Sequence, residues 1–314
     1  MIGGGTPGPG RHRPAPWCEN GTMSPSTSSF FVSDADGTRV ATSTWADVAG
    51  TPAGVVQIAH GLAEHGERYG RFAQALNAAG FIVHAVDHRG HGRTAGERLG
   101  DFGAAGFGGL IADVAQFGAL LGARHPGLPI FLFAHSMGSF AAQAAMLDHA
   151  SVWSGVVLSG STALDLFAAD LANPPPDAPA GLAALNAGFA HRTGYEWLSR
   201  DAAEVDAYMA DPWCGWEVPA DVFPALLAPA PRLTDPRQLA RIRADLPVLI
   251  ASGDADPLAA GGERLRVLAQ RYRDAGLADV AVKLYPGARH EIVNETHRDE
   301  VTADIVAWMR ALLR

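Results

Sequence analysis

Short, almost wholly apolar runs alternate along this chain with longer segments of helical period. The apolar runs cover residues 54–59, 81–86, 130–134, 156–158 and 248–251. Between them, residues 69–79, 110–123 and 137–149 repeat apolar side chains at helical spacing. Strands that are apolar on both faces and separated by helices form parallel sheets covered by helices on both sides. We therefore predict an α/β fold with a mostly parallel central sheet.

The two ends of the chain extend this pattern. Residues 30–33 and 38–46 flank an Asp-Ala-Asp-Gly turn, which predicts an antiparallel hairpin before the parallel strands. After the run at 248–251, a helix is expected over 263–275, a strand over 280–285 and a last amphipathic helix over about 296–313. Both ends therefore contribute to one α/β core, residues 24–160 and 246–314.

The alternation stops between residues 161 and 245, where prolines and aromatic side chains gather. We predict that this inserted segment is helical and covers the core as a cap, or lid. The first residues are rich in Gly and Pro and lack the apolar segment of a signal peptide. Residues 1–23 are therefore expected to be a disordered extension, and Met23 is an alternative start.

Charge and hydropathy exclude several classes of partner. The formal net charge is −9, and no cluster of Lys or Arg of the kind that follows phosphates is visible, so we expect no nucleic acid partner. The longest apolar stretch, 109–123, is interrupted by Asp113 and Gln116, so no stable membrane anchor is expected. Transient lipid contact through the cap stays open, and the sequence does not indicate an oligomeric state.

The chain has two cysteines, Cys18 and Cys214. Two widely separated cysteines are too few for a disulfide framework or a thiolate metal site. We therefore expect a reducing compartment, the cytoplasm.

A serine stands at the turn between a predicted strand and a predicted helix. Residues 130–139 read IFLFAHSMGS, so the apolar strand ends in a turn of small residues around Ser136. This is the context of a nucleophile elbow, in which small residues two before and two after the serine relieve crowding. The usual pattern is G-x-S-x-G, and here Ala134 replaces the first glycine. Ser136 is the candidate nucleophile.

A serine hydroxyl needs a general base, and the base needs a carboxylate to orient it. In α/β-hydrolases the order along the chain is Ser, acid, His. Asp254 and Asp256 follow the predicted strand at 248–251, and His290 follows the strand at 280–285. Both positions lie at the carboxyl edge of a parallel sheet, where ligands bind. Asp165 is a weaker third candidate for the acid.

A serine that attacks a carbonyl group creates an oxyanion, and this oxyanion needs N–H donors to stabilise it. One is expected from Met137 at the start of the helix, and one from the loop after the first parallel strand, where Gly61 lets the backbone turn the Leu62 N–H toward the site. His60 and His65 are expected to brace this loop. We count His60, Gly61 and His135 as supporting residues.

Five motifs in this order resemble those of the monoacylglycerol lipase and lysophospholipase-like branch of the α/β-hydrolases, which are serine aminopeptidase-like hydrolases. They read HGLAEHGERY, DHRGHGRT, AHSMGS, GDADP and GARHEIVNE. The resemblance implies the α/β-hydrolase fold, Ser136 as nucleophile, His290 as base and Asp256, through the family's Gly-x-x-Asp spacing, as acid. It also implies Leu62 and Met137 as oxyanion donors, with no cofactor.

The expected activity is that of a serine carboxylic-ester hydrolase acting on a small-molecule ester such as a monoacylglycerol or lysophospholipid. Amide hydrolysis by the same triad, or a ligand-binding homologue with little turnover, are the alternatives. Aromatic residues of the cap are candidates for the substrate pocket: Phe167, Phe189, Trp197 and Trp213.

Histidine clusters at 60–65 and 84–91 invite a metal assignment, but their spacing does not fit one. The dinuclear pattern H-x-H-x-D-H needs histidines where Val83 and Ala85 stand. We therefore predict no metal site.

Overall fold

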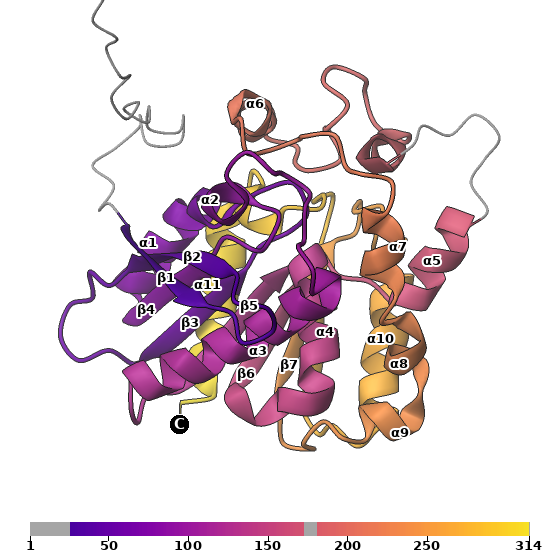
Figure 1. Ribbon diagram of the computed structural model, residues 1–314. Helices are drawn as coiled ribbons and strands as arrows, with labels where there is room; N and C mark the ends of the chain where they lie inside the picture. Colours follow the sequence, from indigo (N-terminus) through magenta and orange to yellow (C-terminus); the bar gives the residue numbers. More distant parts are fainter. Residues whose placement is uncertain (1–25, 173–180, 314) are drawn as a thin grey trace, which may run out of the picture.

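The computed structural model describes residues 26–172 and 181–313 of the chain. The predicted extension 1–23, with Met23 and Cys18, lies outside the described residues. The described part forms one eight-stranded sheet with helices on both faces (Figure 1). The predicted α/β class is therefore confirmed.

The sheet order is β1-β2-β4-β3-β5-β6-β7-β8. The first two strands form the predicted hairpin, and β2 pairs antiparallel with β4, whereas every other pairing is parallel. The strands are β1 (Thr27–Val32), β2 (Arg39–Trp45), β3 (Gly54–Ala59), β4 (Phe81–Val86), β5 (Ile130–His135), β6 (Gly155–Ser159), β7 (Val248–Gly253) and β8 (Val280–Tyr285). Every residue of β3, β4, β5, β6 and β7 is buried, as strands covered on both faces must be.

Two apolar layers cover the sheet. On one face lie α1 (Gly70–Ala78) and α11 (Arg298–Ala311), whose buried side chains share a core with Phe131 and Phe133 of β5. On the other face lie α3 (Gly106–Arg124), α4 (Met137–His149) and α10 (Glu263–Asp274), which pack against Leu132 and other residues of the opposite side. In Figure 1, α3 and α4 lie in front of the strands. Short helices in the loops are η2 (Gly66–Tyr69), α2 (Gly92–Ala95), η3 (Ala150–Val152) and η5 (Ile292–Asn294).

Helix α3 is, among the described residues, the one helix long and apolar enough to cross a membrane. Half of its most apolar window is buried inside the fold, and Leu110, Val114 and Leu121 are almost fully covered. Its composition is that of a core helix packed on a sheet.

The inserted segment, 161–245, adds no strand in its described part. It contains α5 (Leu164–Ala172), η4 (Gly181–Asn186), α6 (Ala202–Ala210), α7 (Val222–Leu227), α8 (Ala230–Thr234) and α9 (Pro236–Leu239). Helix α6 lies above the sheet in Figure 1, and α7, α8 and α9 follow one another beside α10. The predicted helical character of the insertion is therefore confirmed.

Candidate active site

Ser136 occupies a sharp, strained turn. Strand β5 ends at His135 and α4 begins at Met137, which leaves Ser136 alone between them with φ 51° and ψ −120°. Positive φ is costly for a residue with a side chain, and such strain is found at functional sites. Gly138 must lack a side chain, because a Cβ there would lie 2.4 Å from the carbonyl oxygen of Ala59. The predicted elbow geometry is therefore present.

His290 and Asp256 form a buried hydrogen-bonded pair. His290 Nδ1 lies 2.9 Å from Asp256 Oδ2, and both side chains are at most 2% exposed. Asp256 also accepts hydrogen bonds from Ser252 Oγ at 2.7 Å and from the Leu258 N–H at 2.9 Å. Burial alone would raise the pKa of Asp256, but His290 and these donors bring the pKa below its usual value. Asp256 is thus an ionised partner for the imidazole.

The second ring nitrogen of His290, Nε2, takes no part in the pair with Asp256. His290 Nε2 is buried and makes no hydrogen bond to any residue that the structure describes. His290 and Ser136 both line the same pocket. When Nδ1 donates its proton to Asp256, Nε2 is the accepting nitrogen of a side chain that lines the pocket.

The two other acidic candidates point elsewhere. Asp254 Oδ1 accepts the Gly287 N–H at 2.7 Å, which closes a turn at the edge of the sheet. Asp165 on α5 pairs with Arg271 on α10 through two hydrogen bonds of 2.7 and 2.9 Å. None of these hydrogen bonds involves His290.

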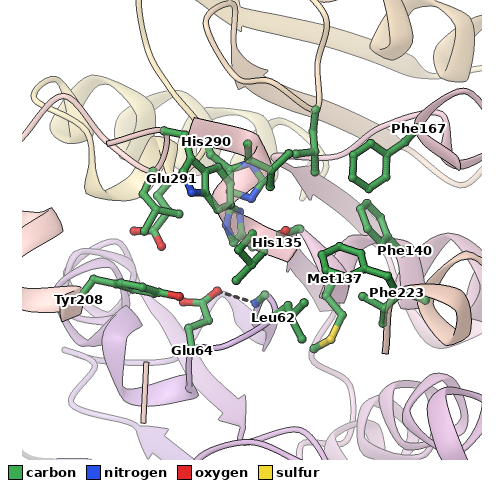
Figure 2. A pocket seen from close by; sticks show the side chains of 18 residues that line it. Leu62, Glu64, His135, Met137, Phe140, Phe167, Tyr208, Phe223, His290 and Glu291 are labelled. Carbon is green, nitrogen blue, oxygen red and sulfur yellow. Dashed lines mark hydrogen bonds between the residues drawn. The ribbon is translucent and has the colours of Figure 1, made fainter. Parts of the chain in front are cut away.

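The loop after β3 passes next to the serine. Leu62 and Met137, the two predicted oxyanion donors, both line the pocket, and their role as donors stays a prediction. A Cβ at Gly61 would lie 3.1 Å from Ser136 Cβ, so only glycine lets the loop approach this closely without a shift. The Gly61 N–H donates to Glu64 Oε1 at 2.5 Å, a hydrogen bond drawn in Figure 2.

The His60 ring holds the loop after β3 through two hydrogen bonds. Its Nε2 accepts the His88 N–H at 2.9 Å, so its Nδ1 carries the proton and donates to the Gly61 carbonyl at 2.7 Å. His135 lies on the other side, with Nδ1 3.3 Å from Ser159 Oγ and its ring centroid 4.6 Å from that of His290. Burial lowers the pKa of both His60 and His135 to about 4.

Because burial keeps His60 and His135 neutral, we predict that the free energy of unfolding falls in mild acid. A histidine with a pKa of about 4 in the fold and 6.5 when unfolded binds its proton first in the unfolded chain. The contribution of each such histidine to the free energy of unfolding is complete above pH 6.5. This contribution declines as the pH falls toward 4, by about 2 kcal/mol between pH 7 and pH 5. Urea unfolding at the two pH values measures the change in the free energy of unfolding. His149→Gln, at an exposed site, is the control and should leave the pH dependence unchanged. A free energy of unfolding that is the same at pH 7 and pH 5 would contradict the prediction.

Ser136, His135 and His290 line one pocket together with residues of the insertion. Figure 2 shows Glu64, Tyr208 and Glu291 at one end and Phe140, Phe167 and Phe223 at the other, with His135 and His290 between them. The remaining lining residues are largely apolar and come from both core and insertion: Leu182, Leu185, Trp197, Leu198, Leu226 and Leu258. The pocket therefore has a polar end and an apolar end.

Two of the four aromatic residues predicted to line the pocket do so. Phe167 and Trp197 are among its walls, and the Trp197 ring centroid lies 4.7 Å from that of His290. Phe189 and Trp213 are not. Phe189 packs under the guanidinium of Arg289, whose central carbon is 4.7 Å from the ring, and Trp213 packs edge-on against His65. Their aromatic surfaces are used in attaching the insertion to the core.

A buried charge network at the polar end was missed in part. Glu64 and Arg68 are four residues apart, and Arg68 Nη1 lies 2.6 Å from Glu64 Oε2. Arg68 also binds both oxygens of Glu291, at 2.6 and 2.7 Å. Burial would raise the pKa of Glu291, but Arg68 lowers the pKa to about 2. Sequence spacing gives no signal for a pair 223 residues apart.

The loop after β3 is also joined to the insertion, through a buried pair of side chains. His65 Nε2 lies 3.0 Å from Asp211 Oδ2. Cys214 lies beside this pair, and the possible metal-binding atoms of the three residues lie within 4.8 Å of one another. No other such group occurs among the described residues. Burial raises the pKa of the Cys214 thiol well above its usual value, whereas a metal-binding cysteine is a thiolate. Tyr208 OH and the Gly215 N–H both donate to the Ala63 carbonyl. We interpret the group as an attachment of the insertion to the loop.

Comparison with known proteins agrees with this geometry. Residues 50–297 match the family described as "Serine aminopeptidase, S33". The chain is 35% identical over 262 residues to the monoacylglycerol lipase of Mycolicibacterium smegmatis, covering 82% of this chain and 88% of that protein. It is 30% identical over 276 residues to the monoglyceride lipase of Mus musculus, covering 83% of each. The structure of a thermostable carboxyl esterase from Bacillus coagulans in complex with glycerol superposes with a TM-score of 0.80 at 26% identity, covering 93% of this chain and all of that one.

Proposed function

This chain belongs to the serine aminopeptidase S33 family of α/β-hydrolases and is a serine ester hydrolase; on that premise we propose that it cleaves monoacyl esters through Ser136, His290 and Asp256. The observation that carries the proposal is the His290–Asp256 pair, which leaves His290 Nε2 facing the pocket beside the strained Ser136. The fold, the order of the three residues along the chain and the relatives all agree with it.

The proposed reaction has two steps through an acyl-enzyme. Ser136 Oγ attacks the ester carbonyl as its proton passes to His290 Nε2, and Asp256 stabilises the imidazolium that forms. The N–H groups of Leu62 and Met137 bind the oxyanion. His290 then protonates the departing alcohol, and a water activated by the same nitrogen releases the fatty acid.

The two ends of the pocket suggest how the ester lies. An acyl chain is best buried against the apolar end, near Phe140, Phe167 and Phe223, and the alcohol then faces Glu64 and Glu291. The relatives named monoacylglycerol lipase have a small polyol as this alcohol. We propose that one acyl chain and a small polar alcohol are what this chain recognises.

Amide hydrolysis, which the family description raises, is less well supported. An aminopeptidase needs a carboxylate available to bind a free amino terminus. Glu64 is already bound by the Gly61 N–H, Tyr69 OH and Arg68, and Glu291 by Arg68 and Asn294. Every carboxylate oxygen at the polar end therefore has a partner.

A substrate panel tests the proposed function. Turnover of monoacylglycerols, lysophospholipids, aryl esters and aminoacyl amides is compared, with Ser136→Ala as the blank. Labelling with a fluorophosphonate separates an enzyme from a ligand-binding homologue, because a competent elbow reacts at Ser136. Turnover of the amides alone, or the absence of labelling, would reject the proposal.

The acyl end predicts a chain-length optimum. Each buried CH₂ contributes about 0.8 kcal/mol, so kcat/KM should rise by up to about fourfold per CH₂ until the apolar end is filled and then stop. Monoacyl esters should be hydrolysed faster than a triglyceride emulsion, whose further chains have no place. Kinetics on a series of monoacylglycerols and p-nitrophenyl esters measures this.

A matched pair of variants locates the acyl end. Phe167→Trp narrows the pocket and should move the optimum to a shorter chain, whereas Phe189→Trp, outside the pocket, should leave it in place. An unchanged optimum in Phe167→Trp, or indifference to acyl length, would argue against this orientation.

We also propose that residues 161–245 act as the cap of this pocket, because Phe167, Trp197 and Tyr208 of that segment line it. Met209 on α6 is 46% exposed, which suits transient contact with a lipid surface. A cytoplasmic location is consistent with the low cysteine count of the chain and with the free thiol of Cys214.

A further inference from the structure

A buried carboxylate outside the proposed triad binds both ends of the loop that carries His290. Glu295 has a fully buried side chain. Its Oε1 accepts the N–H of Arg289 at 2.9 Å and the N–H of Arg200 at 3.0 Å. Its Oε2 accepts the N–H of Thr296 at 3.0 Å and Nε of Arg200 at 2.9 Å. One side chain therefore joins the residue before His290, the residue after itself and a segment of the insertion.

That segment, residues 196–200, is a turn that is hydrogen-bonded to the His290 loop. The His290 N–H donates to the Trp197 carbonyl at 3.2 Å, and the Glu291 N–H donates to the Leu198 carbonyl at 2.8 Å. Ser199 Oγ donates to the Asn294 carbonyl at 2.9 Å. The insertion thus holds the backbone of His290 itself, and we refer to residues 196–200 as the clamp strip.

The charge of Glu295 makes this attachment strong. Burial would raise the pKa of the Glu295 carboxyl, but the N–H groups of Arg289, Arg200 and Thr296 and the Arg200 side chain bring the pKa below its usual value. Hydrogen bonds to an ionised acceptor are stronger than neutral ones. At neutral pH a charged carboxylate therefore fixes the spacing between the clamp strip and the loop.

We propose that Glu295 is a positioning residue for His290, which holds the imidazole in register with Asp256 by clamping its loop against residues 196–200 of the insertion. The inference rests on the proposed function, because Glu295 acts only through His290. A displacement of a catalytic group by about 1 Å can cost about 100-fold in rate.

The first test is Glu295→Gln, which keeps the size of the side chain and replaces one acceptor oxygen with a donor. The amide nitrogen then faces an N–H group, so the loop must shift. We expect kcat to fall about 10- to 100-fold with KM changed less than about twofold, since Phe140, Phe167 and Phe223 at the apolar end of the pocket belong to neither the loop nor the clamp strip. Wild-type kcat in this variant overturns the proposal.

Asp201→Asn is the matched control. Asp201 is also an acidic residue paired with an arginine next to the clamp strip, Arg298 at 2.8 Å, and it caps α6 through the Ala203 N–H. Arg298 Nη1 also donates to the Glu295 carbonyl at 2.9 Å, and Asp201→Asn leaves that bond and all four bonds of the Glu295 carboxylate in place. Asparagine also keeps the cap. We expect wild-type kcat, and a loss equal to that of Glu295→Gln would show a general effect of charge removal and overturn the proposal.

A double variant separates positioning from mere structure. In the His290→Ala background, Glu295→Gln should cause no further loss of the residual rate, because the group that it positions is gone. A further loss of 10-fold or more there overturns the proposal. If His290→Ala itself keeps full activity, the proposed triad is wrong, which is a different outcome from wild-type kcat in Glu295→Gln alone.

Ser199→Ala tests the same attachment if Glu295→Gln does not fold. It removes the hydroxyl that donates to the Asn294 carbonyl at 2.9 Å and accepts the Asp201 N–H at 3.0 Å. We expect a smaller fall in kcat, severalfold, with KM unchanged. Wild-type kcat in folded Ser199→Ala overturns the proposal.

Discussion

Ser136→Ala and His290→Ala should each lower kcat on a monoacyl ester by at least about four orders of magnitude. In the proposed mechanism the two side chains transfer one proton between them, so removing either leaves only the proposed oxyanion donors and substrate binding to accelerate the reaction. KM should change little, because the apolar lining of the pocket is kept. Steady-state kinetics of purified variants, with circular dichroism to verify folding, measures the effect.

Fluorophosphonate labelling adds a second readout for the same pair. Ser136→Ala should lose the label entirely, whereas His290→Ala should react slowly, since its serine is present but not activated. Ser151→Ala and His149→Ala, both exposed near the end of α4, are the controls and should match the unmodified chain. Turnover close to normal in folded Ser136→Ala or His290→Ala would reject the assignment.

Those two residues were recognisable from sequence because the fold itself was. The run at 54–59 is apolar except for Gln57, and all six residues of β3 are buried. In a parallel sheet this pattern locates the carboxyl ends of the strands, and Ser136, Asp256 and His290 each follow one of them. Each side chain could therefore be assigned to the same edge without knowing any contact.

The first residue of helix α3 could not be predicted from the local sequence pattern. The apolar spacing predicts a helix only from residue 110, yet the helix begins at Gly106. Gly109 is required inside it, because a Cβ there would lie 2.7 Å from the guanidinium carbon of Arg89. A glycine kept for packing and a glycine kept for a turn look the same in sequence.

The insertion was harder to predict for a different reason. Its helices are short and its aromatic residues serve two purposes, so composition could not separate Trp197, which contacts His290, from Trp213, which contacts His65. Tyr208, a wall of the pocket, was not singled out at all. These assignments depend on contacts between segments far apart in the chain, which no local period encodes.

Asp256→Asn should lower kcat by about four orders of magnitude as well. In the unmodified chain the carboxylate can only accept, so it keeps the proton of His290 on Nδ1, 2.9 Å away, and leaves Nε2 basic. In the Asp256→Asn variant the amide nitrogen can donate to Nδ1 and so stabilise the tautomer with its proton on Nε2. That nitrogen then cannot accept the proton of Ser136. The side chain volume is almost unchanged, so the loss is one of protonation and charge.

The neighbouring carboxylates distinguish this mechanism from a general effect of removing negative charge. Asp254→Asn keeps an acceptor for the Gly287 N–H, and Asp165→Asn weakens only the pairing with Arg271 between α5 and α10. Both should keep kcat within a few-fold, with Asp165→Asn lowering the melting temperature slightly. If Asp254→Asn or Asp165→Asn were instead the variant that abolished turnover, His290 would have to rotate away from Asp256 during the reaction, and the acid of the triad would be that residue.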